Sequence, residues 1–133
     1  MGVQIKATVK QISATTSEAT ARNHVSLVDR PEAKGGSNRG PMGGELMLMG
    51  IGGCFMSNLL GAVTARQLDI SDLTVDVAAV LEDAPSRFTE IALTVHSAHP
   101  DRPVLQELLD IAERGCLAVN TIRGAVKFSV SLG

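Results

Sequence analysis

The chain contains no tryptophan or tyrosine, and phenylalanine occurs only as Phe55, Phe88 and Phe128. Stacking platforms for nucleic-acid bases and aromatic cages for cations are both built from aromatic rings, so neither is expected here. The formal net charge of −2 also provides no positive potential that would attract a polyanion. We therefore expect no nucleic-acid partner, and a core made of aliphatic and methionine side chains.

The first twenty residues lack a long hydrophobic run. The segment "MGVQIKATVKQISATTSEAT" alternates polar and apolar residues, whereas a secretory signal contains an apolar stretch of about 7 to 15 residues. The start "MGVQIK" also lacks the serine or threonine of a myristoylation signal. These features predict no membrane anchor and a cytoplasmic location.

Cysteine is scarce, since Cys54 and Cys116 are the only two. In a reducing compartment a permanent disulfide is uncommon, and a transient or catalytic disulfide is the usual exception. Two widely separated cysteines are too few for a zinc knuckle. The stretch "GIGG" lacks the preceding strand and the spacing of a dinucleotide fingerprint. We expect neither a metal nor a cofactor.

The length of 133 residues suits one domain, residues 1–133, with one core. A strict alternation of apolar and polar residues predicts strands at 3–11, 16–21, 24–29, 73–81, 91–95 and 125–132. Helical periodicity predicts a helix at 45–67 and a second one that opens at Asp101, has Pro103 in its first turn and carries Cys116 on its buried stripe. The order βββαββαβ predicts an α+β fold.

The apolar run at 46–63 is close to the length of a membrane span. However, Ser57, Asn58 and several glycines interrupt it, and the flanking segments have the pattern of soluble amphipathic strands. A helix that is apolar on nearly all sides is buried on nearly all sides. A chain this small would achieve that burial most easily as a homodimer.

Both cysteines lie on apolar sides of predicted helices that must share one core, so their proximity is plausible. The alternative is that they are ordinary core residues, because free cysteine is among the most buried residue types. Methionines at 47, 49 and 56 could form an apolar substrate surface near Cys54, although irregular core packing explains them better.

Glycines at 50, 52 and 53 precede Cys54 within the first predicted helix. Each costs about 0.8 to 1 kcal/mol relative to alanine in a helix, so another feature should compensate for them. Close approach of a neighbouring backbone is one explanation. A small opening beside the Cys54 sulfur is the functional alternative.

Two segments carry a family resemblance. "GGELMLMGIGGCF" resembles the "PxELLLxAxGGC" helix segment of the OsmC/Ohr family, the osmotically inducible protein C and organic hydroperoxide resistance proteins, and "CLAVNTIRGAVKFSV" resembles that family's second motif around "CPxSNxLRG". One cysteine falls in each motif, and the element order and length also match. The resemblance covers nearly the whole chain and points to a less characterised OsmC-like branch.

The resemblance implies an OsmC-like fold, with antiparallel sheets wrapped around long central helices in an intertwined homodimer. It also implies a thiol peroxidase for oxidative stress defence, with Cys54 as the peroxidatic cysteine and Cys116 as the resolving one. The substrates would be organic hydroperoxides. The reductant would be a dithiol, typically a dihydrolipoyl group.

An arginine should approach Cys54, because burial disfavours a thiolate and only a nearby cation or donor restores it. By resemblance this arginine comes from the segment upstream of the cysteine helix, where Arg30 and Arg39 are the candidates and Arg30 is narrowly preferred. The family glutamate that orients it lies ten positions before the cysteine, where this chain has Gly44. Glu45, nine positions before, is included among the candidate catalytic residues. In a regular helix it would point away from Cys54, and the alternative is a helix-start carboxylate favoured by the macrodipole.

Two functions from different classes therefore remain open: a cysteine-based peroxidase, or a dimeric binding or scavenging module with an apolar pocket and little peroxidase turnover. A hotdog-type thioesterase would leave the paired cysteine motifs unexplained and lacks a positioned carboxylate. The histidines at 24, 96 and 99 are predicted to be surface residues, because no acidic partner is suitably spaced for a triad or a metal site.

Overall fold

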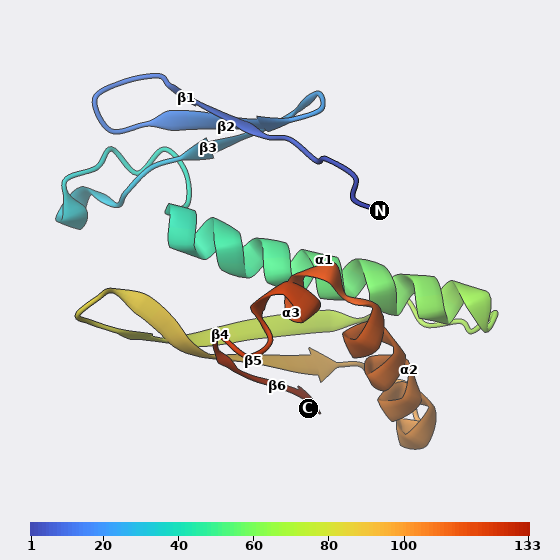
Figure 1. Cartoon of the computed structure of the whole chain (residues 1–133). Coiled ribbons are helices and arrows are strands. Elements are labelled where there is room, and N and C mark those ends of the chain that lie inside the picture. Colours follow the sequence, from blue (N-terminus) through green and yellow to red (C-terminus); the bar gives the residue numbers. More distant parts are fainter. The chain divides into compact units, whose positions relative to one another are not determined.

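The computed structural model describes all residues from 1 to 133 and divides into two compact units, Met1–Met47 and Leu48–Gly133. Figure 1 shows the elements of both units in sequence colours. The expectation of a single domain over 1–133 stays a prediction.

The N-terminal unit is a three-stranded antiparallel meander of β1 (Thr8–Gln11), β2 (Ser17–Ala21) and β3 (His24–Val28), followed by the short 3-10 helix η1 (Glu32–Lys34) (Figure 1). The first strand is shorter than predicted and begins at Thr8 rather than at residue 3. Only two residues of this unit are buried, Thr16 and Asp29, and both are polar. The sheet thus lacks a hydrophobic core of its own.

The C-terminal unit holds most of α1 (Gly43–Ala65), followed by β4 (Thr74–Glu82), β5 (Arg87–His96), α2 (Arg102–Gly115), α3 (Leu117–Ile122) and β6 (Lys127–Leu132). The strand order is β4-β5-β6. The β4–β5 pair is an antiparallel hairpin, as the alternation predicts, whereas β6 runs parallel to β5. The helical crossover through α2 and α3 allows this parallel pairing, so the second sheet is mixed rather than antiparallel throughout.

The hydrophobic core lies entirely in the C-terminal unit. Alternate residues of β5 are fully buried, which places one face of that strand inside. The helices α1 and α2 cover the core with their apolar sides. Its largest fully buried side chains are Phe55, Leu59, Ile91, Leu93, Leu105, Leu108 and Leu109.

The second helix begins as the sequence predicts. Asp101 is its N-cap and accepts a hydrogen bond from Val104 N at 3.1 Å, with Pro103 in the first turn. The helix ends at Gly115, so Cys116 does not lie on it as predicted: Cys116 has an extended backbone (φ −79°, ψ 114°) and separates α2 from α3, although it is fully buried. This break after the poor helix former Gly115 turns the chain at the cysteine itself.

The helix α1 is long and apolar enough to cross a membrane by length and composition alone. Such a test is also passed by the core helices of soluble proteins. Here Ile51, Phe55 and Leu59 are buried in the hydrophobic core, which is the arrangement of a core helix. The other side of the same helix stays exposed, as at Met49 and Leu60.

Candidate functional site

The two cysteine sulfurs lie in contact. Cys54 projects from α1, and Cys116 occupies the junction between α2 and α3. The Cys116 thiol donates a hydrogen bond to Cys54 Sγ at 3.4 Å, and both residues are free thiols. A disulfide bond measures about 2 Å, so a small side-chain movement would join the sulfurs. The fold therefore brings together the two residues that the sequence motifs single out.

The two thiols have different surroundings. Cys116 is fully buried, whereas Cys54 is only partly buried. Burial raises the pKa of the Cys116 thiol, and the neighbouring Cys54 sulfur raises it further, although backbone N–H groups of Val119 and Ala118 act in the opposite direction. Cys116 is thus held as a protonated thiol that donates toward the more accessible sulfur.

Asn58 forms a three-residue cluster with Cys54 and Cys116. It lies one helical turn after Cys54, and its Nδ2 donates to the Cys54 backbone oxygen at 3.0 Å. In the sequence, Asn58 stands out only as an interruption of the apolar run. Its spacing of four residues from Cys54 places both on one helix face, and that was the available signal.

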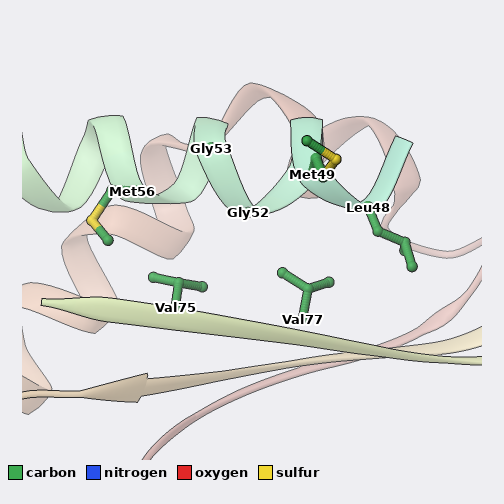
Figure 2. Close-up of a pocket in the computed structure, with 7 residues that line it drawn as sticks. All are labelled: Leu48, Met49, Gly52, Gly53, Met56, Val75 and Val77. Atoms are coloured by element: carbon green, nitrogen blue, oxygen red, sulfur yellow. The ribbon is translucent and has the colours of Figure 1, made fainter. Parts of the chain in front are cut away.

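An apolar pocket of about 390 Å³ lies between α1 and β4 (Figure 2). Its lining consists of Leu48, Met49, Gly52, Gly53, Met56, Val75 and Val77. Cys54 is absent from this lining, although the preceding Gly53 is part of it. The pocket thus lies beside Gly52 and Gly53, and Cys54 does not line it as the functional explanation of the glycines would require.

Gly52 is the glycine that packing requires. A Cβ at this position would lie 2.8 Å from Val77 Cγ2 on β4, which is closer than such atoms approach. Close approach of the sheet therefore explains this residue. At Gly50 and Gly53 an added Cβ would meet nothing within 4 Å, so packing within the described chain explains neither.

Arg30 and Arg39 stand at the two ends of one tight loop in the N-terminal unit. The carboxylate of Asp29 accepts hydrogen bonds from Arg30 N at 2.7 Å, Arg39 N at 3.3 Å, Ser37 N at 3.4 Å and Thr16 Oγ1 at 2.8 Å. One buried carboxylate thus fixes the backbone of both candidate arginines. Sequence reasoning missed Asp29, because its partners are distributed along the chain.

Burial by itself would raise the pKa of Asp29, but the Thr16 hydroxyl and the three backbone donors lower it to about 2. Because this folded-state value lies below the ordinary 3.8, the carboxylate stabilises the loop above about pH 4. That stabilisation is lost as the pH falls from about 4 toward 2.

We expect the backbone amide resonances of Arg30, Ser37 and Arg39 to titrate together with a midpoint near 2, because all three donate to the same carboxylate. NMR spectra recorded across the acid range measure this midpoint. Asp29→Asn is the matched control and should remove the shared transition. A midpoint near 3.8 would show that the amides do not hold the charged form.

Glu45 is the third residue of α1, and its Oε1 accepts a hydrogen bond from Met42 N at 2.9 Å. It thereby satisfies a backbone donor at the start of the helix, where a negative charge is favoured. This contact agrees with the interpretation of Glu45 as a helix-start carboxylate. Its predicted catalytic role stays a prediction, as do the roles of Arg30 and Arg39.

The histidines occupy exposed positions or local contacts. His96 Nε2 lies 3.0 Å from Asp76 Oδ2 in an exposed pair on the second sheet, and His99 Nδ1 accepts from Asp101 N. No group of three or more His, Cys, Asp or Glu side chains in residues 1–133 is arranged to hold a metal ion.

Comparison with known proteins identifies the family. The sequence profile described as "OsmC-like protein" matches residues 35–131, which include both cysteines. The chain belongs to the OsmC-like protein family. No protein of curated function matches it by sequence.

Solved structures of other OsmC-like proteins share the fold. An OsmC-like protein from Mycoplasma pneumoniae matches with a TM-score of 0.83 and 20% identity, over 100% of this chain and 98% of that one. An organic hydroperoxide resistance protein from Legionella pneumophila matches at 0.75 and 19%, over 98% and 97% of the two chains. The organic hydroperoxide resistance protein of Bacillus subtilis matches at 0.69 and 20%, over 98% of each.

Proposed function

We propose that this OsmC-like protein is a thiol peroxidase that reduces organic hydroperoxides in oxidative stress defence. The observation that carries the proposal is the 3.4 Å contact between a partly exposed sulfur and a fully buried one. Two similar structures are named organic hydroperoxide resistance proteins, which supports the same class of substrate.

The proposed chemistry has two steps. In the first, the Cys54 thiolate attacks the terminal oxygen of ROOH, the O–O bond breaks, Cys54 becomes a sulfenic acid and the alkoxide leaves as ROH after taking a proton. In the second, the Cys116 sulfur attacks the Cys54 sulfur, the S–O bond of the sulfenic acid breaks, and the hydroxyl leaves as water with the proton of the Cys116 thiol. The peroxide gains two electrons, and the two thiols together lose two.

The oxidised enzyme must be reduced again by thiol exchange. An external dithiol attacks the Cys54–Cys116 disulfide, gives it two electrons and two protons, and leaves as its own disulfide while both enzyme thiols are restored. A dihydrolipoyl protein is the class of reductant that the family resemblance favours. This cycle requires a reducing compartment, in keeping with the predicted cytoplasmic location.

Arg30 or Arg39 would stabilise the Cys54 thiolate and the alkoxide that leaves. Asp29 supports this role, because it fixes the backbone on both sides of the loop that carries the two arginines. Arg30→Ala and Arg39→Ala, made separately, distinguish them. The variant that loses the acting arginine should alkylate Cys54 more slowly near neutral pH, and unchanged rates in both would remove arginine from the mechanism.

A homodimer would give the exposed apolar surfaces a partner. The N-terminal sheet has no buried hydrophobic residue and exposes Val9 and Val25. The exposed surface of α1 includes Leu60 and the small residue Gly61, around which open space permits close helix packing. Sedimentation equilibrium should give twice the 13.9 kDa chain mass, and a monomer at micromolar concentration would overturn the proposal.

The function is tested by counting thiols. One equivalent of an alkyl hydroperoxide, added to the reduced protein, should remove both free thiols of each chain and yield one intramolecular disulfide. Ellman titration and the mass of the unreduced chain measure this outcome. A thiol count that stays constant over minutes would contradict the peroxidase.

The apolar pocket favours a second candidate, a dimeric binding or scavenging module with little peroxidase turnover. Its lining is entirely apolar apart from backbone, and Cys54 takes no part in it (Figure 2). Such a pocket would hold an aliphatic chain rather than a charged ligand. Stable binding of an aliphatic hydroxyl compound, together with a constant thiol count under hydroperoxide, would favour this function.

A further inference from the structure

Gly115 immediately precedes Cys116 and faces the side chain of Asn58. A Cβ built on Gly115 would lie 3.0 Å from Asn58 Oδ1, a separation at which the neighbour must give way by a few tenths of an ångström. Because Gly115 has no side chain, the Asn58 amide fits beside it. This contact joins α1 to the last residue of α2.

A hydrogen bond ties the Asn58 amide to the turn of α1 that carries Cys54. Its Nδ2 is already engaged with the Cys54 backbone oxygen at 3.0 Å. A group that pushed on Oδ1 would therefore act on the turn of α1 that carries Cys54. On the opposite side, the push would act on the residue next to Cys116. Asn58 is thus linked to Cys54 by a hydrogen bond, and Gly115 is linked to Cys116 by the peptide bond.

We propose that Asn58 and Gly115 form a spacer that sets the approach of the two sulfurs, so that the Cys54 sulfenic acid is captured by Cys116 before a second peroxide reaches it. This inference rests on the proposed peroxidase. Asn58 and Gly115 are positioning residues, because neither touches the reacting atoms. They affect whether the Cys54 sulfenic acid reacts with Cys116 or with a second peroxide.

The two fates differ in atoms and electrons. Capture by Cys116 forms the S–S bond and releases water. Reaction of the sulfenic acid with a second ROOH instead transfers one more oxygen to Cys54, releases ROH and leaves a sulfinic acid, which ordinary thiols do not reduce. A slower approach of Cys116 therefore appears as sulfinic acid in the product mixture.

Gly115→Ala is the central variant. Alanine favours a helix more than glycine does, so the substitution should not unfold α2. It should nevertheless displace Asn58 and separate the sulfurs. Misplacement of reacting groups by about 1 Å can cost up to about 100-fold in rate, so a displacement of a few tenths of an ångström should slow disulfide closure on the order of tenfold. Sulfinic acid at Cys54 should accumulate under excess hydroperoxide, while the first oxidation step keeps its rate.

The double variant Asn58→Ala with Gly115→Ala tests the contact itself. Asn58→Ala removes the amide that the new methyl group meets, so Gly115→Ala should have no further effect in that background. Gly43→Ala provides a matched glycine control, because its added Cβ meets nothing within 4 Å. Mass spectrometry of the hydroperoxide-treated chains separates the disulfide from the sulfinic acid.

The inference is overturned if Gly115→Ala gives the same ratio of disulfide to sulfinic acid as the wild type. It is also overturned if Gly115→Ala changes this ratio as much in the Asn58→Ala background as in the wild type. Closure of the dithiol by diamide needs no peroxidase activity, because the diazene is reduced to a hydrazine while the two thiols form a disulfide. The rates of disulfide closure by diamide should rank the variants in the same order as the rates of closure under hydroperoxide. A wild type that ignores hydroperoxide but shows this order would disprove the peroxidase and keep the spacer.

Discussion

Cys54→Ser will abolish the reaction of the protein with organic hydroperoxides, whereas Cys116→Ser will retain its first step. The expectation follows from the unequal exposure of the two sulfurs. Cys54 is partly accessible, while Cys116 is fully buried and is held protonated by its surroundings. Only the first can meet a peroxide and attack it as a thiolate.

The magnitude of this loss should be large. A serine hydroxyl is a far weaker nucleophile than a thiolate. Cys54→Ser should therefore consume hydroperoxide no faster than a variant in which both cysteines are replaced. Stopped-flow measurement of hydroperoxide consumption quantifies the first step. Residual fast consumption by Cys54→Ser would make Cys116 the nucleophile and reverse the assignment.

The Cys116→Ser variant is the matched control. It should form a sulfenic acid at Cys54 that dimedone traps, and it should proceed to the sulfinic acid when hydroperoxide is in excess. It should not form an intramolecular disulfide. If this variant instead fails to react at all, Cys116 is required for the first step, and a purely resolving role is contradicted.

Phe55→Ala will destabilise the C-terminal unit by about 3 to 5 kcal/mol, the usual cost of emptying a fully buried phenylalanine site. Phe55 follows Cys54 directly and is fully buried in the core. Whole domains are stable by only about 5 to 15 kcal/mol, so the variant should lie close to its unfolding limit at 25 °C. Urea unfolding of the reduced protein measures the change.

Leu81→Ala is the control for this prediction, because Leu81 is 57% exposed on β4. Surface substitutions usually change stability by no more than about 0.5 kcal/mol. Both variants must be compared at one protein concentration, since a homodimer would make stability depend on it. Equal losses for Phe55→Ala and Leu81→Ala would show that Phe55 is not a core residue in solution.

The family resemblance places an orienting glutamate where this chain has Gly44, so peroxidase activity is a separate prediction from the fold. Glu45 accepts a hydrogen bond from Met42 N at the start of α1, which is a sufficient structural reason for its presence. If hydroperoxide reduction is fast without this glutamate, Asp29 offers another way to order the arginine loop, because it fixes the loop through backbone donors.

The sequence by itself determined the features that have a regular period or a local signal. The alternation along β4, β5 and β6, the apolar stripe of α2 and its Asp101 cap were all predictable from residues close together in the chain. The family followed from two short motifs that each contain a cysteine, and the family profile confirms it.

Only the tertiary structure decided how these elements meet. The parallel pairing of β6 with β5, the 3.4 Å sulfur contact and the fit of Asn58 against Gly115 all join segments that are distant in sequence. The break of the helix at Cys116 is local, but the apolar stripe continues through it and did not predict it. Periodicity states which face of an element is apolar, but it does not state which atoms lie opposite that face. Those distances arise from close packing of side chains in one core, and packing depends on all the elements at once.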